Sequence, residues 1–92
     1  MKAQSLNVML GDLNRSQEAL ARYQQDPETV ATSYGVTTEE LERLKAKDMG
    51  WLYVHGVHPY ILVQFSFAIG YDFRQYLKEL QEATTGDEGV SG

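Results

Sequence analysis

Residues 49–71 contain no Asp, Glu, Lys or Arg, so every charged side chain of the chain lies outside this segment. The segment holds both histidines and the only tryptophan, together with several tyrosines and phenylalanines. An uncharged, aromatic-rich run of this length becomes a hydrophobic core, a membrane span or a surface that another molecule covers. The role of this uncharged segment therefore limits which folds the chain can adopt.

A membrane span is the least compatible role for the uncharged segment. Spanning a bilayer takes about 20 consecutive apolar residues. Gly56, His58, Pro59, Gln64 and Ser66 interrupt the run, and roughly ten strongly apolar positions follow Pro59, which is too few. The N-terminal residues show no sustained apolar run of the kind found in signal peptides. We expect no membrane partner.

Length and charge restrict the function further. A chain of 92 residues forms one domain at most, and a domain of this size buries only about 60–65% of its unfolded surface. The net charge of −5 argues against a nucleic-acid partner, because phosphate binding relies on clustered Lys and Arg. The absence of cysteine excludes disulfides and thiol chemistry, which fits a cytoplasmic protein.

Apolar spacing predicts a helical chain. Helices are expected over residues 5–25, 27–34, 38–47, 48–55, 59–69 and 73–83, with a break near residues 14–16 where Ser16 can cap a second helix. Residues 84–92 show no apolar pattern and are predicted to be a flexible, disordered tail. The prediction is an all-α, compact bundle of five or six short helices over residues 1–83.

Two helix starts carry strong capping signals. Asp26 followed by Pro27 places a hydrogen-bond acceptor before a residue that lacks an N–H, and Gly35 suits the left-handed position that ends a helix. Thr37 and Glu40 have the spacing of a capping box. These signals predict short helices that begin and end at defined residues.

The conformation of residues 51–69 is open between two alternatives. Pro59 and Gly70 frame a helix, whereas Val63, Phe65 and Phe67 alternate with more polar residues as in a strand. We favour the helix, because the neighbouring segments are helical and an isolated two-stranded hairpin is poorly stable.

His55 and His58 are the obvious candidates for metal binding. Gly56 and Pro59 place the two rings on either side of a helix break, so they need not converge on one ion. Two ligands without a third make a weak metal site. We favour a capping role for His58 and a half-buried position for His55, and we predict no metal site.

No other residues form a catalytic pattern. Ser66 lacks the glycines that flank a nucleophilic serine, and a serine within a helix commonly bonds its own backbone. Glu39, Glu40 and Glu42 lie in a capping segment and on a solvated helix face. We predict no catalytic residue in this chain.

The aromatic residues have two interpretations. They can form the core, where burying a large apolar side chain contributes about 1.5–3 kcal/mol, or they can anchor a partner. A helix that is apolar on every side must be enclosed by other parts of the protein or by a partner. A few short helices are too few to enclose it easily. The predicted partner-binding residues are Trp51, Tyr53, His55, His58, Pro59, Tyr60, Phe65 and Phe67.

The order of several motifs resembles a known family. Asp26-Pro27-Glu28 is followed by Tyr34-Gly-Val-Thr37 and then by Gly56-Val-His-Pro-Tyr60. With Leu62 after it, the last motif reads Gly-Val-His-Pro-x-x-Leu and is the most specific part. The segment from about Leu6 to Gly70 is similar to the LigA-type small subunit of the extradiol ring-cleavage dioxygenases, the protocatechuate 4,5-dioxygenase group.

This resemblance implies an all-helical accessory subunit. In that family the large subunit carries the catalytic Fe(II) and opens the aromatic ring, and the small subunit packs on it and helps to cover the active site. The resemblance therefore implies no cofactor in this chain, an iron-bearing partner, and a role in aromatic catabolism.

Two other functions remain open at this point. The same small fold is similar to the leader region of borosin-type modified peptides, which docks on a methyltransferase that modifies the C-terminal stretch. The tail of this chain is short, acidic and rich in glycine, unlike a methylated core. The other alternative is a free-standing helical domain that self-associates as a homo-oligomer.

Overall fold

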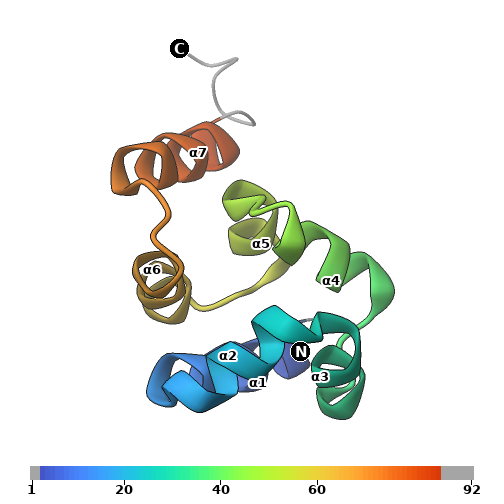
Figure 1. The fold of residues 1–92 in the computed structure, drawn as a ribbon. Helices are drawn as coiled ribbons and strands as arrows, with labels where there is room; N and C mark the ends of the chain where they lie inside the picture. Colours follow the sequence, from blue (N-terminus) through green and yellow to red (C-terminus); the bar gives the residue numbers. More distant parts are fainter. Residues whose placement is uncertain (1–2, 86–92) are drawn as a thin grey trace.

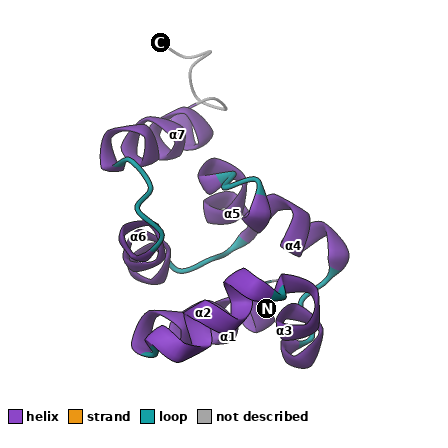
Figure 2. Cartoon of the chain, in the orientation of Figure 1, coloured by secondary structure: helices purple, strands orange, loops and turns teal. Residues whose placement is uncertain are grey.

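The computed structural model describes residues 3–85, and this part of the chain forms seven helices and no strand (Figures 1 and 2). The helices are α1 (Gln4–Arg15), α2 (Gln17–Gln25), α3 (Pro27–Tyr34), α4 (Thr38–Lys45), α5 (Met49–His55), α6 (Pro59–Ala68) and α7 (Phe73–Thr85). The all-α prediction is confirmed, and the hairpin alternative for residues 51–69 is wrong. The helix α7 includes residues 84 and 85, where the tail was predicted to begin, and residues 86–92 lie outside the described part.

The predicted number of five or six helices is corrected to seven, because the segment 5–25 is divided in two. Ser16 adopts an extended backbone (φ −137°, ψ 116°), and its hydroxyl accepts a hydrogen bond of 3.1 Å from the N–H of Ala19. This cap begins α2 as a separate helix. The helix α1 begins one residue before the predicted start at residue 5, after Ala3 and without a side-chain cap.

The strong capping signals are confirmed. Asp26 accepts from the N–H of Thr29 at 3.4 Å ahead of Pro27, and Gly35 ends α3 with φ 82°. The capping box is complete, because the Thr37 hydroxyl accepts from the Glu40 N–H at 3.1 Å while the Glu40 carboxylate accepts from the Thr37 N–H at 2.9 Å. Local sequence therefore determines where α3 and α4 begin.

The core lies where α1 packs against α6, with α2 and α3 forming a layer beside α1. In Figure 1, α7 lies at the opposite end of the molecule from this layer and packs on α5. The fully buried side chains are Leu6, Met9, Leu10, Leu44, Met49, Leu52, Val57, Leu62, Phe65 and Ser66. Six of these ten belong to the uncharged segment, so this segment supplies much of the core.

The contact between α5 and α7 depends on a glycine. A Cβ atom placed on Gly50 would lie 3.0 Å from the carbonyl oxygen of Glu79 and 3.2 Å from Cβ of Ala83. Only a residue without a side chain allows this close approach. The Glu79 side chain adds a hydrogen bond of 3.1 Å from the N–H of Met49 and another from the hydroxyl of Tyr71.

None of the helices within residues 3–85 is both long and apolar enough to cross a membrane. The uncharged segment is divided between α5 and α6 by the turn at Gly56, so neither helix reaches the length of a span.

Candidate functional site

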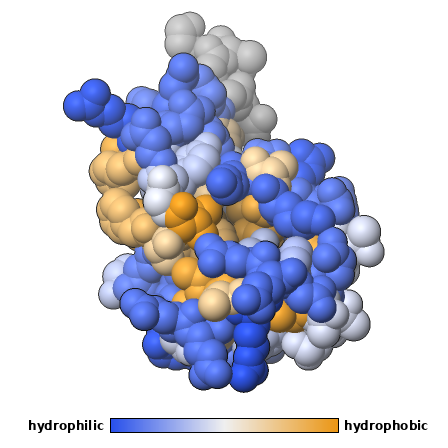
Figure 3. All heavy atoms as spheres, in the orientation of Figure 1, coloured by the Kyte–Doolittle hydropathy of each residue, from blue (hydrophilic) through white to orange (hydrophobic). Residues whose placement is uncertain are grey.

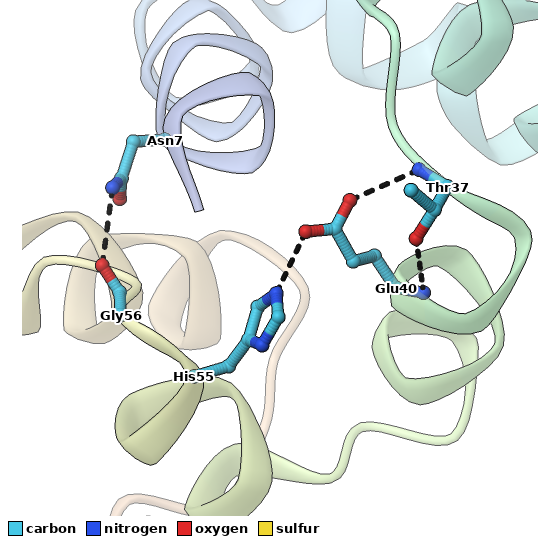
Figure 4. A network of polar contacts seen from close by, with 5 residues as sticks. All are labelled: Asn7, Thr37, Glu40, His55 and Gly56. Atoms are coloured by element: carbon cyan, nitrogen blue, oxygen red, sulfur yellow. Dashed lines mark hydrogen bonds and ion pairs between the residues drawn. The ribbon is translucent and has the colours of Figure 1, made fainter. Parts of the chain in front are cut away.

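The turn between α5 and α6 is held against α1 by a single asparagine. Asn7 donates from Nδ2 to the carbonyl oxygen of Gly56 at 3.2 Å and accepts at Oδ1 from the N–H of His58 at 2.8 Å (the first contact is drawn in Figure 4). Gly56 has φ 122°, a conformation that favours glycine, and Val57 is buried between them. The Gly-Val-His-Pro motif is thus a turn anchored at both ends to α1.

His58 caps α6, as predicted. Its Nδ1 accepts a hydrogen bond of 3.2 Å from the N–H of Tyr60, ahead of Pro59 at the first position of the helix. The side chain is exposed. Since Nδ1 accepts, the neutral ring carries its hydrogen on Nε2 and presents a donor to the solvent.

His55 lies on the other side of the turn and points toward α4. Its Nε2 is 2.7 Å from Oε2 of Glu40, and the ring stacks on Trp51 with centroids 4.3 Å apart and planes 16° from parallel (Figure 4 shows the pair with Glu40). The guanidinium of Arg43 lies 5.1 Å from the centroid of the Trp51 ring. The His55 side chain is largely buried by these contacts, so it links α5 to α4.

Glu40 has two structural roles, and only the first, in the capping box, was predicted from the sequence. Besides completing the capping box, it holds His55, and only 5% of its surface is exposed. Burial alone raises the pKa of a carboxyl group, but the hydrogen bonds from the Thr37 N–H and from His55 outweigh it and hold the pKa of Glu40 below its usual value. The expectation that this carboxylate lies on a solvated face is wrong.

The two histidines do not converge. His55 is engaged by Glu40, whereas His58 is exposed and caps a different helix. No group of three or more His, Asp or Glu side chains within residues 3–85 is arranged to hold a metal ion. Ser66 is buried and donates to the carbonyl oxygen of Val63 at 2.7 Å, the backbone bond expected of a helical serine.

An exposed aromatic face extends from α6 to α7. Tyr60 is 65% exposed and Phe67 is 61% exposed, although both lie on the most apolar helix of the described chain. Phe67 stacks on Phe73 of α7 with centroids 5.4 Å apart, and Leu77 continues the face one turn later. We call Tyr60, Phe67, Phe73 and Leu77 the outer face; apolar surface at the α6–α7 junction is seen at the left of Figure 3.

The predicted partner-binding residues fall into three groups. His58, Pro59, Tyr60 and Phe67 are exposed, whereas Trp51, Tyr53 and His55 are half-buried. Phe65 is buried, because only 1% of it is exposed and its ring meets Tyr23 edge-on inside the core. Helical geometry explains the difference from Phe67, since residues two positions apart on a helix point in nearly opposite directions. Binding of a partner by these residues stays a prediction.

Three residues of this region were not predicted from the sequence. Asn7 carries no signal of its own, because an asparagine within a helix is common and its partners lie about fifty positions away. Phe73 and Leu77 were not among the predicted partner-binding residues, yet both are exposed. The polar residues interspersed among the apolar residues of α6 were the one available signal that part of this helix is exposed.

No curated protein and no solved structure shows significant similarity to this chain. The family model described as "Aromatic-ring-opening dioxygenase LigAB, LigA subunit" matches residues 6–87. This match includes all seven helices of the described chain apart from the first two residues of α1. The resemblance seen in the motifs is therefore confirmed, and the chain belongs to the LigA subunit family of aromatic-ring-opening dioxygenases.

Proposed function

We propose that this protein is a non-catalytic accessory subunit that docks on a large, Fe(II)-bearing subunit of an extradiol-type dioxygenase and covers its active site. Membership of a subunit family supports a catalytic partner. The partner would bind the iron and open the aromatic ring, and this chain would close the mouth of the site.

The outer face is the observation that carries this proposal. Four large apolar side chains lie exposed on two consecutive helices of a chain of only 92 residues, and two of them, Phe67 and Phe73, stack across the junction of these helices. Contiguous apolar patches on small soluble proteins mark surfaces that another molecule covers. Complete burial of one such side chain contributes about 1.5–3 kcal/mol, so Tyr60 and Phe67 alone are strong anchors for a partner.

The residues around the outer face fit docking better than catalysis. His58 lies next to Tyr60 at the start of α6 and offers an Nε2 donor to whatever covers this end of the helix. The Asn7 bonds hold the turn in place before a partner arrives, which lowers the entropy lost on association. The histidines are not arranged to hold the iron themselves.

Co-expression with a candidate large subunit tests the proposal. The wild-type chain should co-purify with the large subunit and raise its ring-opening activity. Phe67→Asp should abolish co-purification while leaving the helical circular dichroism signal intact, because the carboxylate would be buried only in the complex. Val8→Asp is the matched control, since Val8 is an exposed apolar residue of α1 outside the outer face.

Three results would contradict the proposal. The first is separate elution of the two chains with unchanged ring-opening activity. The second is a concentration-dependent homodimer by light scattering that Phe67→Asp dissociates, which would assign the outer face to a second copy of this chain. The third is a mass increase in residues 86–92 after co-expression with a neighbouring methyltransferase, which would support the modified-peptide alternative.

A further inference from the structure

A small cavity opens at the junction of α2, α4 and α6, away from the outer face. Its volume is about 280 Å³, near the lower end of the range for small-molecule sites. Apolar surface in the middle of the view in Figure 3 is bordered there by polar side chains. The cavity is lined by Tyr23, Gln24, Pro27, Leu44, Lys45, Lys47, Phe65 and Ile69.

Tyr23 brings an unused hydrogen-bond donor to this cavity. The residue is only 7% exposed, and its hydroxyl makes no hydrogen bond to another residue within 3–85. Within residues 3–85, Oδ1 of Asn14 is the only side-chain N or O atom that is both inaccessible to solvent and without a hydrogen-bond partner. The Tyr23 hydroxyl also lacks a partner, so it must be accessible to solvent. Burial, with a smaller effect of Glu28, raises the pKa of Tyr23 to about 12, so the hydroxyl is a donor at neutral pH.

Lys47 brings a positive charge to the same cavity at a conformational cost. It is the one non-glycine residue with positive φ in the described chain, at 58°. Such a position usually holds glycine, because a residue with a side chain is strained there. Lys47 forms no ion pair within residues 3–85, whereas its neighbour Lys45 is 2.8 Å from Glu28.

The lining combines these polar groups with an apolar wall. Leu44, Phe65 and Ile69 supply apolar surface, and no acidic side chain lines the cavity although the chain as a whole carries a net charge of −5. Tyr23 and Lys47 line the same cavity as this apolar wall, and a hydroxyl donor with an unpaired ammonium beside apolar side chains matches a carboxylate attached to an apolar body.

We propose that this cavity binds a small carboxylate with an apolar body, whose oxygens accept a hydrogen bond from Tyr23 and pair with Lys47. The apolar body lies against Leu44, Phe65 and Ile69. None of the outer-face residues lines the cavity. The site is therefore independent of the proposed docking role, and either can fail without the other.

Titration of the full chain with benzoate, followed by amide chemical shifts, tests the site. Benzoate should shift the amides of residues 23–24, 44–47 and 65–69, and benzamide should bind about tenfold more weakly, because a hydrogen bond to a charged group contributes about 1.5–3 kcal/mol. Shifts that are absent, that cluster elsewhere, or that are equal for the two ligands would overturn the proposal.

Two variants separate binding from folding. Tyr23→Phe keeps the ring and removes the hydroxyl, and Lys47→Gly removes the charge while placing glycine at a conformation that suits it. Each should weaken benzoate binding about tenfold with thermal stability kept or raised. The matched controls Tyr60→Phe and Lys78→Ala alter exposed residues outside the cavity and should bind as wild type. Wild-type affinity in both cavity variants would refute the assignment.

Discussion

The uncharged segment 49–71 contains two sets of apolar residues that differ in burial but not in character. The inner set (Met49, Leu52, Val57, Leu62 and Phe65) is almost completely buried, whereas the outer set (Val54, Tyr60 and Phe67) is largely exposed. Both sets lie on α5, α6 and the turn between them. The same stretch of sequence therefore serves as the core on one side and as an open surface on the other.

This difference shows that the packing of neighbouring helices, and not amino-acid composition, decides which residues are buried. The helix α1 packs on one side of α6, and α7 packs mainly on α5 and reaches only the edge of α6. The opposite side of α6 has no helix of its own over it within the described chain. A chain of this length has too few helices to enclose an all-apolar helix.

The largest expected effect comes from charging the inner set. Phe65→Asp would place a carboxylate among side chains that exclude water, at a cost of about several kcal/mol. Marginal stability makes this cost sufficient to unfold a small domain. Circular dichroism and thermal melting should show loss of the helical signal at room temperature.

Phe67→Asp is the matched variant in the outer set, two residues later on the same helix. Its folding free energy should change by less than about 0.5–1 kcal/mol, because the side chain remains in water. If Phe67→Asp unfolds the protein as Phe65→Asp does, the division of α6 into inner and outer sets is wrong.

The next largest effect tests the close packing of α7, which borders the outer face. Gly50→Ala inserts a Cβ atom 3.0 Å from the backbone oxygen of Glu79, so the two helices must separate, at a cost of about 1–3 kcal/mol. Urea denaturation measures the loss, and hydrogen exchange should rise in α7 before it rises in α1.

Gly11→Ala provides the control for that measurement. A Cβ atom at Gly11, in the interior of α1, would meet only the guanidinium of Arg15 at 3.5 Å. Alanine is a better helix former than glycine, so this variant should be more stable by about 0.5–1 kcal/mol. Equal destabilisation by both substitutions would show that α5 and α7 are not closely packed.

A smaller effect tests the hydrogen bond between His55 and Glu40, which connects α5 to α4. Glu40→Gln removes the charge that holds His55 while keeping the shape of the side chain. The expected loss is about 1–2 kcal/mol in urea denaturation at neutral pH, because hydrogen bonds that involve a charged group are stronger than neutral ones. Glu39→Gln, an exposed neighbour, is the control.

The pH dependence of this effect has a defined sign. The folded pKa of Glu40 lies below the usual value of 4.5, so the carboxylate stabilises the fold above pH 4.5 and this contribution is lost as the pH falls through the folded pKa. The difference in unfolding free energy between wild type and Glu40→Gln should shrink below about pH 4.5. A difference that grows with acid would rule out a depressed pKa.

The smallest effect on stability is expected for the turn between α5 and α6, which lies between Val57 of the inner set and Tyr60 of the outer set. Asn7→Ala removes both hydrogen bonds to the turn, which are partly open to solvent, and should cost about 0.5–1.5 kcal/mol. Amide exchange at Val57 and His58 should accelerate more than exchange in α3. Gln4→Ala, an exposed change in the same helix, should leave that turn protected.

The parts of the fold that depend on near neighbours were predictable. The caps at Asp26 and Thr37 and the helix ends at Gly35 and Gly56 involve residues within five positions of one another, so their signals are complete in a short stretch of sequence. The cap at Ser16 is predictable for the same reason. The predicted number of helices is too low because the segment 5–25 was counted as one helix despite the predicted break near residues 14–16.

The parts that depend on distant residues were not predictable. His55 meets Glu40 across 15 positions, and Asn7 meets Gly56 and His58 across about fifty. Phe65 and Phe67 are the same residue type in the same helix, and no local pattern indicated which of them is buried. The positive φ of Lys47 also escaped prediction, because lysine is not a residue associated with that conformation.

The sequence by itself determined that this chain is helical, where most of its helices begin and end, and that residues 49–71 supply much of its apolar surface. Hydrogen bonding of caps and exclusion of apolar side chains from water act through local order and composition, so both can be read along the chain. Only the tertiary structure decided which side of α6 is covered, that Glu40 secures His55, and that Tyr23 and Lys47 share a cavity. These outcomes depend on how helices distant in sequence pack together, and packing geometry is a property of the folded chain as a whole.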